Sequence, residues 1–284
     1  MTVPARLPVI MIVMAAAAIG GAHASERIEW ALIDFPPFQI LDGSAKETGS
    51  FDGLLQLLIR RMPQYGHDIV PMTFARREAE SREGQAMCTP GMFRTPAREA
   101  YWEFSRPALL HLDNRIVFLA DSAGKFPGEG PVDLEALFLR DDVVGGIAAG
   151  RSYAPNIDAL VQRYGTTRRN LVVRPVRADQ FFQMLLGGEI DYVILFPHEA
   201  NFMAERYGAG GRIAVRPIAG TPATITTSVA CTRTPLGHEV IAAVDATVAA
   251  QLDDPDYRML SERWYGEADK TLIRRHYGRQ LEGR

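Results

Sequence analysis

Short apolar runs alternate along this chain with segments in which apolar residues recur at helical spacing. Residues 28–33 form an apolar run with partial alternation, which predicts a first strand. Residues 51–62 carry apolar side chains at helical spacing, and Pro63 ends the predicted helix. A second strand is expected over 69–74, followed by a short polar helix over 76–84. Strands that alternate with helices predict an α/β fold with a mainly parallel sheet.

The same alternation returns after a segment rich in glycine and proline. Residues 122–131 form this segment, which predicts the exit from a first domain. Beyond it, the pattern predicts a second α/β unit with strands over 142–147, 171–176 and 191–196 and a helix over 179–186. A strand over 224–231 and a long amphipathic helix over 236–252 then follow a proline-bounded turn. The chain is therefore predicted to build one domain from both ends, with a second inserted near residues 120–220.

The N-terminus is typical of a cleaved targeting segment. Arg6 supplies positive charge, residues 9–19 form a short apolar core, and Ala22-His23-Ala24 offers an A-x-A cleavage site. The core is shorter than the roughly 20 apolar residues of a transmembrane helix. We therefore expect a signal peptide over 1–24 and an exported chain that begins at Ser25. An uncleaved signal anchor is the alternative.

Composition and charge exclude several classes of function. The 260 residues that remain (284 − 24) are enough for two domains, or for one large domain. The net charge of −3 provides no basic field of the kind on which nucleic-acid binding relies. The sequence has no phosphate-binding loop, no Gly-x-Ser-x-Gly elbow and no histidine pair at metal-ligand spacing. No nucleic acid, metal or cofactor is therefore expected.

The most informative motif lies within residues 88–107. A strand-like stretch ends at Pro90-Gly91, Thr95 and Arg98 follow three residues apart, and Phe104-Ser105-x-Pro107 comes six residues after the arginine. This spacing resembles the T-x-x-R…F-S-x-P signature of family 3 bacterial extracellular solute-binding proteins, the type II periplasmic binding proteins.

Other short motifs fit that family in the same order along the chain. They are Pro36-Pro37-Phe38, Gly150-x-Ser152-Tyr153, the Gly187-Gly188-Glu189-Ile190-Asp191 start of a strand, and Arg263-Trp264-Tyr265-Gly266. The ordered set covers nearly the whole chain after residue 24. The resemblance implies a two-lobed periplasmic-binding-protein type II fold of the α/β class, with two crossover strands between the lobes. Lobe 1 is expected over 25–119 and 221–284, and lobe 2 is expected as an insertion over 120–220.

The cysteines are Cys88 and Cys231. Two cysteines in an exported chain favour a disulfide, because the compartment is oxidising. In the fold that the resemblance implies, both belong to strands of lobe 1, close to the crossover. A disulfide between them is expected, and two buried thiols are the alternative.

The resemblance makes Arg98 the main candidate for ligand binding in lobe 1. In the family, the arginine at this position grips the carboxylate of a small ligand, and a guanidinium offers paired donors that match the two carboxylate oxygens. Thr95 can add a hydroxyl, and an aromatic residue at the position of Phe35 covers the apolar part of the ligand. The alternative for Arg98 is a surface side chain paired with Glu99 or Glu103. Arg76 and Arg94 are weaker candidates.

The corresponding residues of lobe 2 depart from the family pattern. Ser152 and the amides around it resemble a second carboxylate clamp, in which Arg151 replaces a small polar residue and could add a positive charge. Amino-acid-binding members place an aspartate about five residues after the position of Asp191, to hold the ammonium of the ligand. Phe196 stands there in this chain. Either Glu199 takes over that role, or, as we favour, the ligand is a carboxylate without an α-amino group.

The function implied by the resemblance is capture of a small anionic, carboxylate-bearing solute in a cleft between the lobes. The protein would be a periplasmic monomer that delivers this solute to an inner-membrane permease of an ABC-type transporter, and it would not be an enzyme. Two alternatives remain open. The chain could be an accessory or sensory module whose cleft has lost its ligand, or a dehydratase-like enzyme that uses Glu199 as a general acid.

Overall fold

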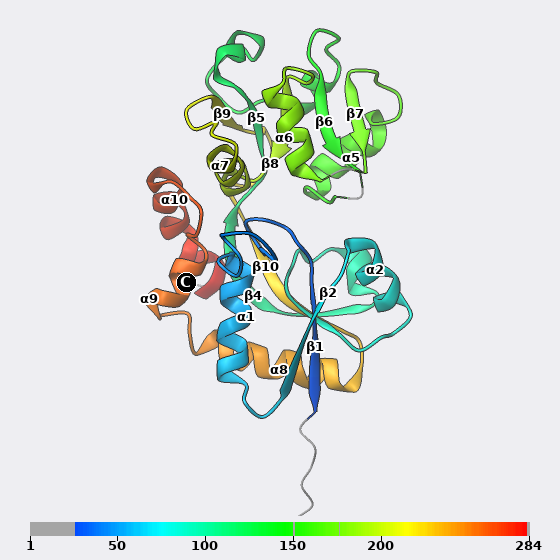
Figure 1. Ribbon diagram of the computed structural model, residues 1–284, viewed down its shortest axis with the longest axis vertical. Coiled ribbons are helices and arrows are strands. Elements are labelled where there is room, and N and C mark those ends of the chain that lie inside the picture. Colours follow the sequence, from blue (N-terminus) through cyan, green and yellow to red (C-terminus); the bar gives the residue numbers. More distant parts are fainter. Residues whose placement is uncertain (1–25, 150, 176, 283–284) are drawn as a thin grey trace, which may run out of the picture.

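Two α/β lobes, one above the other in Figure 1, make up the computed structural model of the protein. The structure describes residues 26–149, 151–175 and 177–282. The predicted signal peptide, residues 1–24, lies outside the described residues. Within the described ranges, no helix has both the length and the apolar character needed to cross a membrane.

The sheet of lobe 1 has the strand order β2-β1-β3-β10-β4. Its strands are β1 (Arg27–Leu32), β2 (Gly66–Pro71), β3 (Cys88–Met92), β4 (Trp102–Leu112) and β10 (Thr224–Thr232). β1 is parallel to β2 and β3, whereas β10 is antiparallel to its neighbours β3 and β4. Because β10 comes from far along the chain and lies between β3 and β4, lobe 1 is built from both ends of the sequence.

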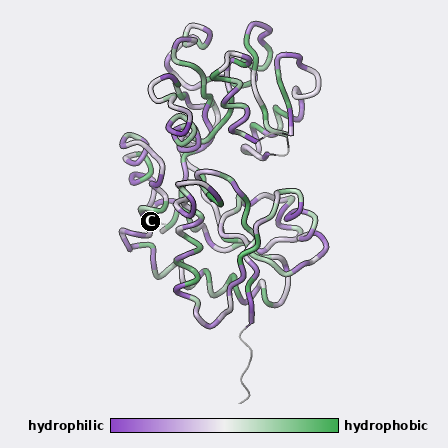
Figure 2. Tube along the Cα trace, in the orientation of Figure 1, coloured by the Kyte–Doolittle hydropathy of each residue, from purple (hydrophilic) through white to green (hydrophobic). Residues whose placement is uncertain are grey.

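Helices cover both faces of this sheet. They are α1 (Ser50–Arg61), α2 (Phe74–Arg82), α3 (Pro96–Glu99), α8 (Pro235–Ala249), α9 (Pro255–Leu260) and α10 (Glu267–Tyr277), which continues into a π-helical turn at Gly278–Glu282. The apolar face of α1 supplies Leu54 and Leu58 to the core, and α8 supplies Val240 and Val244. Figure 2 shows hydrophobic residues mainly along the strands in the middle of each lobe, and hydrophilic residues mainly toward the periphery.

The sheet of lobe 2 has the order β7-β6-β8-β5-β9. Its strands are β5 (Arg115–Leu119), β6 (Gly145–Ala148), β7 (Leu171–Arg174), β8 (Tyr192–Leu195) and β9 (Ile213–Pro217). The helical segments are a 3-10 helix (Ala120–Lys125), α4 (Leu134–Phe138), α5 (Pro155–Tyr164), α6 (Ala178–Leu186) and α7 (Pro197–Arg206). β6 is parallel to β7 and β8, and β5 is antiparallel to β8 and β9.

The border between the lobes lies earlier than the sequence pattern predicts. The predicted lobe 1 extends to residue 119, but Arg115–Leu119 forms β5 and pairs with β8 and β9 of lobe 2. The first crossover is therefore the short segment 113–114, directly after β4, and the second is 218–223, between β9 and β10. An apolar run does not reveal which sheet it joins, because both sheets bury such runs.

The strand expected to end at Pro90-Gly91 instead begins at Cys88 and includes both residues. β3 and β10 pair on either side of this dipeptide with a shift in register, so two residues of β3 stand opposite one residue of β10. Such a bulge accommodates a proline, which has no N–H to donate. A Cβ on Gly91 would lie 2.4 Å from the ring of Phe51, so only glycine fits there.

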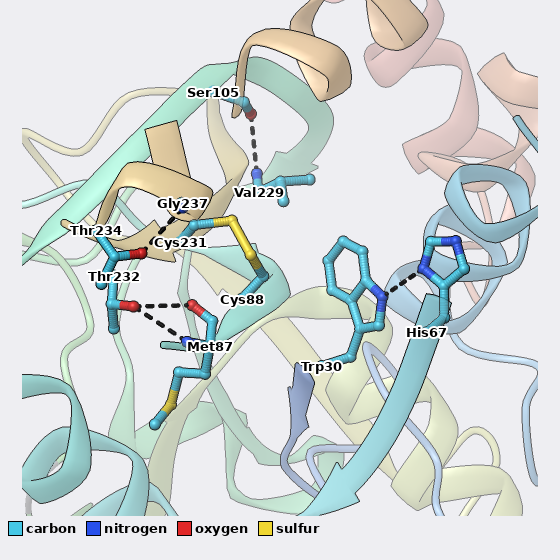
Figure 3. The surroundings of a disulfide bond; sticks show 10 residues. All are labelled: Trp30, His67, Met87, Cys88, Ser105, Val229, Cys231, Thr232, Thr234 and Gly237. Atoms are coloured by element: carbon cyan, nitrogen blue, oxygen red, sulfur yellow. Dashed lines mark hydrogen bonds between the residues drawn. A yellow bond between two sulfur atoms is a disulfide. The ribbon is translucent and has the colours of Figure 1, made fainter. Parts of the chain in front are cut away.

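A disulfide joins Cys88 to Cys231 across the β3–β10 pair, with the two Cα atoms 4.0 Å apart (Figure 3). The prediction of this disulfide is confirmed. Hydrogen bonds surround it, from the Met87 N–H to Thr232 Oγ1 (3.1 Å) and from the Val229 N–H to Ser105 Oγ (3.0 Å). The disulfide and these hydrogen bonds thus link β3, β10 and β4, which are neighbouring strands in the sheet of lobe 1.

Candidate functional site between the lobes

A buried ion pair between Arg151 and Glu199 lies near the lobe junction. Arg151 Nη1 donates to Glu199 Oε1 (2.8 Å) and Nη2 donates to Oε2 (2.7 Å). The side chains are only 10% and 1% exposed, respectively. Burial by itself lowers the pKa of Arg151, but the charge of Glu199 and its hydrogen bonds outweigh burial and raise the pKa.

Three aromatic rings surround the guanidinium of Arg151. Its Cζ lies 4.9 Å from the ring centre of Tyr153, 5.1 Å from that of Phe196 and 5.4 Å from that of Phe35. A cation within about 6 Å of such a ring is attracted by its quadrupole, and the attraction grows when water is excluded. Phe35 belongs to the loop after β1, so this cluster contains side chains of both lobes.

The start of α7 fixes the position of Glu199. Pro197 occupies the first turn of the helix and Phe196 is its N-cap residue. Glu199 Oε2 accepts the backbone N–H of Phe196 (3.3 Å), which is the reciprocal half of a capping box. The carboxylate is therefore held at the helix N-terminus, where negative charge is favoured.

The hydroxyl of Ser152 is engaged within lobe 2. It donates to Asp158 Oδ2 (2.7 Å), and Oδ1 of the same carboxylate accepts the Tyr153 N–H (2.8 Å). α5 begins at Pro155 with Ala154 as its N-cap residue. The role of Ser152 as a carboxylate clamp stays a prediction, and it requires Ser152 to release Asp158.

In lobe 1, Thr95 and Arg98 shape the short helix α3. Thr95 is its N-cap residue, and its Oγ1 accepts the Arg98 N–H (3.4 Å). The half-buried Arg98 donates from Nη1 to the carbonyl of Phe93 (2.9 Å). The phenyl ring of Phe93 stacks on Phe196 of lobe 2, with centroids 5.6 Å apart. Arg98 is thus attached to a residue that contacts the opposite lobe.

The acidic residues nearest to Arg98 in sequence have other partners. Glu99 pairs with Arg94, and Glu103 accepts from His238 (2.9 Å). Within the described part of the chain, no carboxylate lies within 4 Å of the Arg98 guanidinium. The alternative in which Arg98 pairs with Glu99 or Glu103 is therefore wrong.

Two residues that the sequence did not single out, Phe74 and Arg77, lie beside Arg98 and Phe35. Arg77 is 4% exposed, lies against the Phe74 ring (5.4 Å) and donates to Glu78 (3.2 Å). Burial lowers the pKa of Arg77 to about 10, and the positive charge of Arg98 acts in the same direction. Phe74 is 46% exposed and contacts Phe35 edge to face (5.8 Å). The sequence indicated Arg76 as a weaker candidate, but the helical phase of α2 leaves Arg76 on the surface, paired with Glu80, and buries its neighbour Arg77.

The full-chain comparisons identify the family. The model of the bacterial extracellular solute-binding proteins, family 3, matches residues 31–267. The chain belongs to this family. The family prediction from the motif spacing is thereby confirmed, and the two-lobed fold with it. A search of curated proteins found no match.

Solved structures with the same fold match both lobes of this family-3 protein. The periplasmic VFT2 domain of BvgS from Bordetella pertussis is 21% identical, with a TM-score of 0.62 over 84% of this chain and 93% of that one. AbpA from Streptococcus pneumoniae, an amino acid ABC transporter substrate-binding protein bound to L-arginine, is 18% identical (TM-score 0.63, 84% and 94% covered). A histidine kinase sensor domain similar to periplasmic binding proteins is 16% identical (TM-score 0.66, 85% and 96% covered). These likenesses establish the fold.

An aromatic cluster fills the lobe junction of this family member next to the crossover. Phe38 of lobe 1 contacts Phe196 (5.2 Å) and His198 (4.4 Å) of lobe 2, and His198 also lies 4.5 Å from Tyr265. His111 of β4 stacks on His198 (5.7 Å). Phe196, which replaces the expected aspartate, is thus a buried apolar contact between the lobes.

Two cavities lie away from this cluster. One cavity, of about 430 Å³, lies between the lobes and is lined by Asp34 and Trp264 among others. Arg177 of lobe 2, which also lines it, pairs with Asp34 (3.2 Å). The other, of about 580 Å³, lies between α1 and α9 on lobe 1. Among the described residues, no group of three histidine, cysteine, aspartate or glutamate side chains could hold a metal ion.

The buried histidines predict a loss of stability in acid. Burial lowers the pKa of His111 to about 3. Burial, together with the neighbouring His111 and the positive charge of Arg151, lowers the pKa of His198 well below its usual value. In the unfolded chain both rings take up a proton near pH 6.5, but in the folded protein they do not. Their contribution to the free energy of unfolding is therefore complete above pH 6.5 and is lost as the pH falls toward 3. At pH 5 we expect each histidine to lower the free energy of unfolding by about 2 kcal/mol.

Urea unfolding at pH 7.5 and pH 5 measures this effect. His198→Phe is expected to remove about half of the difference between the two pH values. His238→Gln, which changes an exposed histidine, serves as the matched control. An unchanged difference in His198→Phe would contradict the prediction.

Proposed function

We propose that this protein captures a small carboxylate-bearing solute between its two lobes, with Arg98 as the anion-binding group. The observation that carries the proposal is the half-buried guanidinium of Arg98, which has one carbonyl acceptor and no carboxylate partner among the described residues. Arg77 lies close by and pairs with Glu78, so these two arginines share the neighbourhood of a single carboxylate. The local excess of positive charge favours an anion, and a guanidinium binds a carboxylate with two parallel hydrogen bonds.

The apolar part of the solute would contact Phe74 and Phe35. Phe74 offers an exposed ring beside Arg77, and Phe35 extends the aromatic surface toward lobe 2. A solute that contacts both lobes binds the closed form more tightly than the open form, and this difference in affinity stabilises the closed form. Delivery of the solute to an inner-membrane permease is the part of the proposal that rests on family membership.

Arg98→Ala is expected to weaken binding of the carboxylate solute by about 10- to 150-fold, because one hydrogen bond to a charged group contributes about 1.5–3 kcal/mol. The ligand is first found by a thermal-shift screen of organic acids and amino acids, and its affinity is then measured by calorimetry. Arg94→Ala is the matched control, since Arg94 is an exposed arginine of the same loop that pairs with Glu99. Equal affinities in Arg98→Ala and the wild type would refute the role of Arg98.

A specific observation favours a second candidate, an accessory or sensory module without a solute. The Arg151–Glu199 pair already bridges the region in which the family pattern predicts the ligand ammonium. In that case no acid or amino acid in the screen shifts the melting temperature, and Arg98→Ala leaves partner binding unchanged. The enzyme alternative has less support, because both oxygens of Glu199 already accept hydrogen bonds from Arg151.

A further inference from the structure

The surroundings of the Arg151 guanidinium are those of a bound ligand. One buried carboxylate accepts two parallel hydrogen bonds from it, and three aromatic rings from two lobes lie within 5.4 Å of its Cζ. Asn114, in the first crossover, places Oδ1 3.5 Å from Nη2. Lobe 1, lobe 2 and the crossover all contribute to this site, as they would for a solute held between lobes.

The carboxylate end of the site and the Arg151 side chain are held by different kinds of structure. Glu199 and Phe196 belong to the start of α7, and both side chains are buried. Arg151 instead comes from the irregular segment between β6 and α5. The carboxylate and its helix are therefore fixed, whereas the guanidinium is brought in by a loop.

We infer that Arg151 is a built-in occupant of a guanidinium-binding site formed by Phe35, Tyr153, Phe196 and Glu199, and that it holds the lobes together when no solute is present. The site takes a planar guanidinium or amidinium cation, which replaces the Arg151 side chain. This inference goes beyond the proposed function, since it does not require Arg98 to bind a carboxylate.

The charge of the buried carboxylate determines the class of ligand. A solute anion that draws Arg151 away leaves Glu199 buried without a partner, and breaking such a pair from one side is strongly unfavourable. A guanidinium cation that replaces Arg151 keeps Glu199 paired and keeps the rings next to a cation. A primary ammonium ion lacks the planar pair of donors, so it binds this arrangement less well.

Chemical rescue of Arg151→Ala tests the inference. N-ethylguanidinium is the probe, because it has the atoms that this substitution removes. Arg151→Ala is expected to melt at a lower temperature than the wild type. At ten times its dissociation constant the probe is expected to raise the melting temperature of the variant by about 3–6 °C. Small-angle scattering is expected to show a larger radius of gyration in Arg151→Ala, and recovery of the wild-type value with the probe.

Controls separate occupation of the site from general stabilisation. The wild-type protein is expected to bind the probe at least about tenfold more weakly, because its own side chain competes as a tethered ligand. N-ethylurea, which is planar but neutral, and ethylammonium are expected to give no rescue. Arg177→Ala removes a different, exposed contact between the lobes and is the matched variant, in which the probe should have no effect.

Three results would overturn the inference. They are a melting temperature of Arg151→Ala that the probe leaves unchanged, an equal shift in Arg177→Ala, and equal rescue by ethylammonium. If Arg151→Ala does not fold, Arg151→Lys keeps the charge and removes the fork of donors. The probe must then bind Arg151→Lys more tightly than the wild type, and failure to do so overturns the inference.

Discussion

Replacing Cys88 and Cys231 together with alanine is expected to lower the free energy of unfolding by about 4–5 kcal/mol. The two residues are 143 positions apart, so the disulfide closes a loop that contains the whole of lobe 2. Closing a loop of this length removes much of the conformational entropy of the unfolded chain. Urea unfolding of the oxidised protein and of the double variant at pH 7.5 measures the difference.

Chemical reduction is the control for the predicted effect of the disulfide on stability. Reduction of the wild-type protein under the same conditions should reproduce the loss seen in the double variant, whereas the reductant should leave the double variant unchanged. A loss below about 1 kcal/mol would mean that the β3–β10 pairing remains partly formed in the unfolded chain, which would contradict the entropic account.

Glu199→Ala is expected to destabilise the protein by about 3–5 kcal/mol, because it leaves the guanidinium of Arg151 buried without a counter-ion. Three surrounding rings exclude water from this guanidinium, so solvent cannot replace the lost carboxylate. Urea unfolding at pH 7.5 gives the value directly. Asp141→Ala is the matched control within lobe 2, since Asp141 also pairs with an arginine, Arg168, but is 90% exposed. Asp141→Ala is expected to lower the free energy of unfolding by no more than about 1 kcal/mol.

A double variant separates the effect of the unpaired charge from that of the packing around it. Arg151→Met combined with Glu199→Leu replaces both charges with apolar groups, and such a replacement is often neutral or stabilising. The double variant should therefore be more stable than Glu199→Ala. If it is as unstable as the single variant, loss of packing and not an unpaired charge explains the effect.

Much of the fold followed from local pattern. The predicted strand over 224–231 agrees with β10 to within one residue, and the predicted helix over 236–252 agrees with α8 to within a few residues. Periodicity predicts these segments well because burial of one face imposes it on the sequence. The strand Arg115–Leu119 was assigned to the wrong lobe, because its pairing partners are almost 80 and 100 residues away.

The candidate site was only partly predictable. Motif spacing singled out Arg98, Arg151 and Glu199 as separate candidates, but did not indicate that the last two pair with each other across 48 residues. Phe74 and Arg77 were missed because nothing in the local sequence distinguishes an inward-facing arginine from its neighbour. In the helix, Arg76 pairs with Glu80 on the surface whereas Arg77 is buried.

Periodic burial and short motifs in a fixed order were enough to indicate the family, the two-lobed α/β fold and the disulfide. Which strand belongs to which lobe, and which charges meet, depends on contacts between residues far apart in the chain. Arg151 and Glu199 are separate candidates in the sequence, 48 residues apart. They become an ion pair because the loop after β6 and the first turn of α7 converge at the lobe junction, where aromatic rings remove the water that would otherwise solvate both charges.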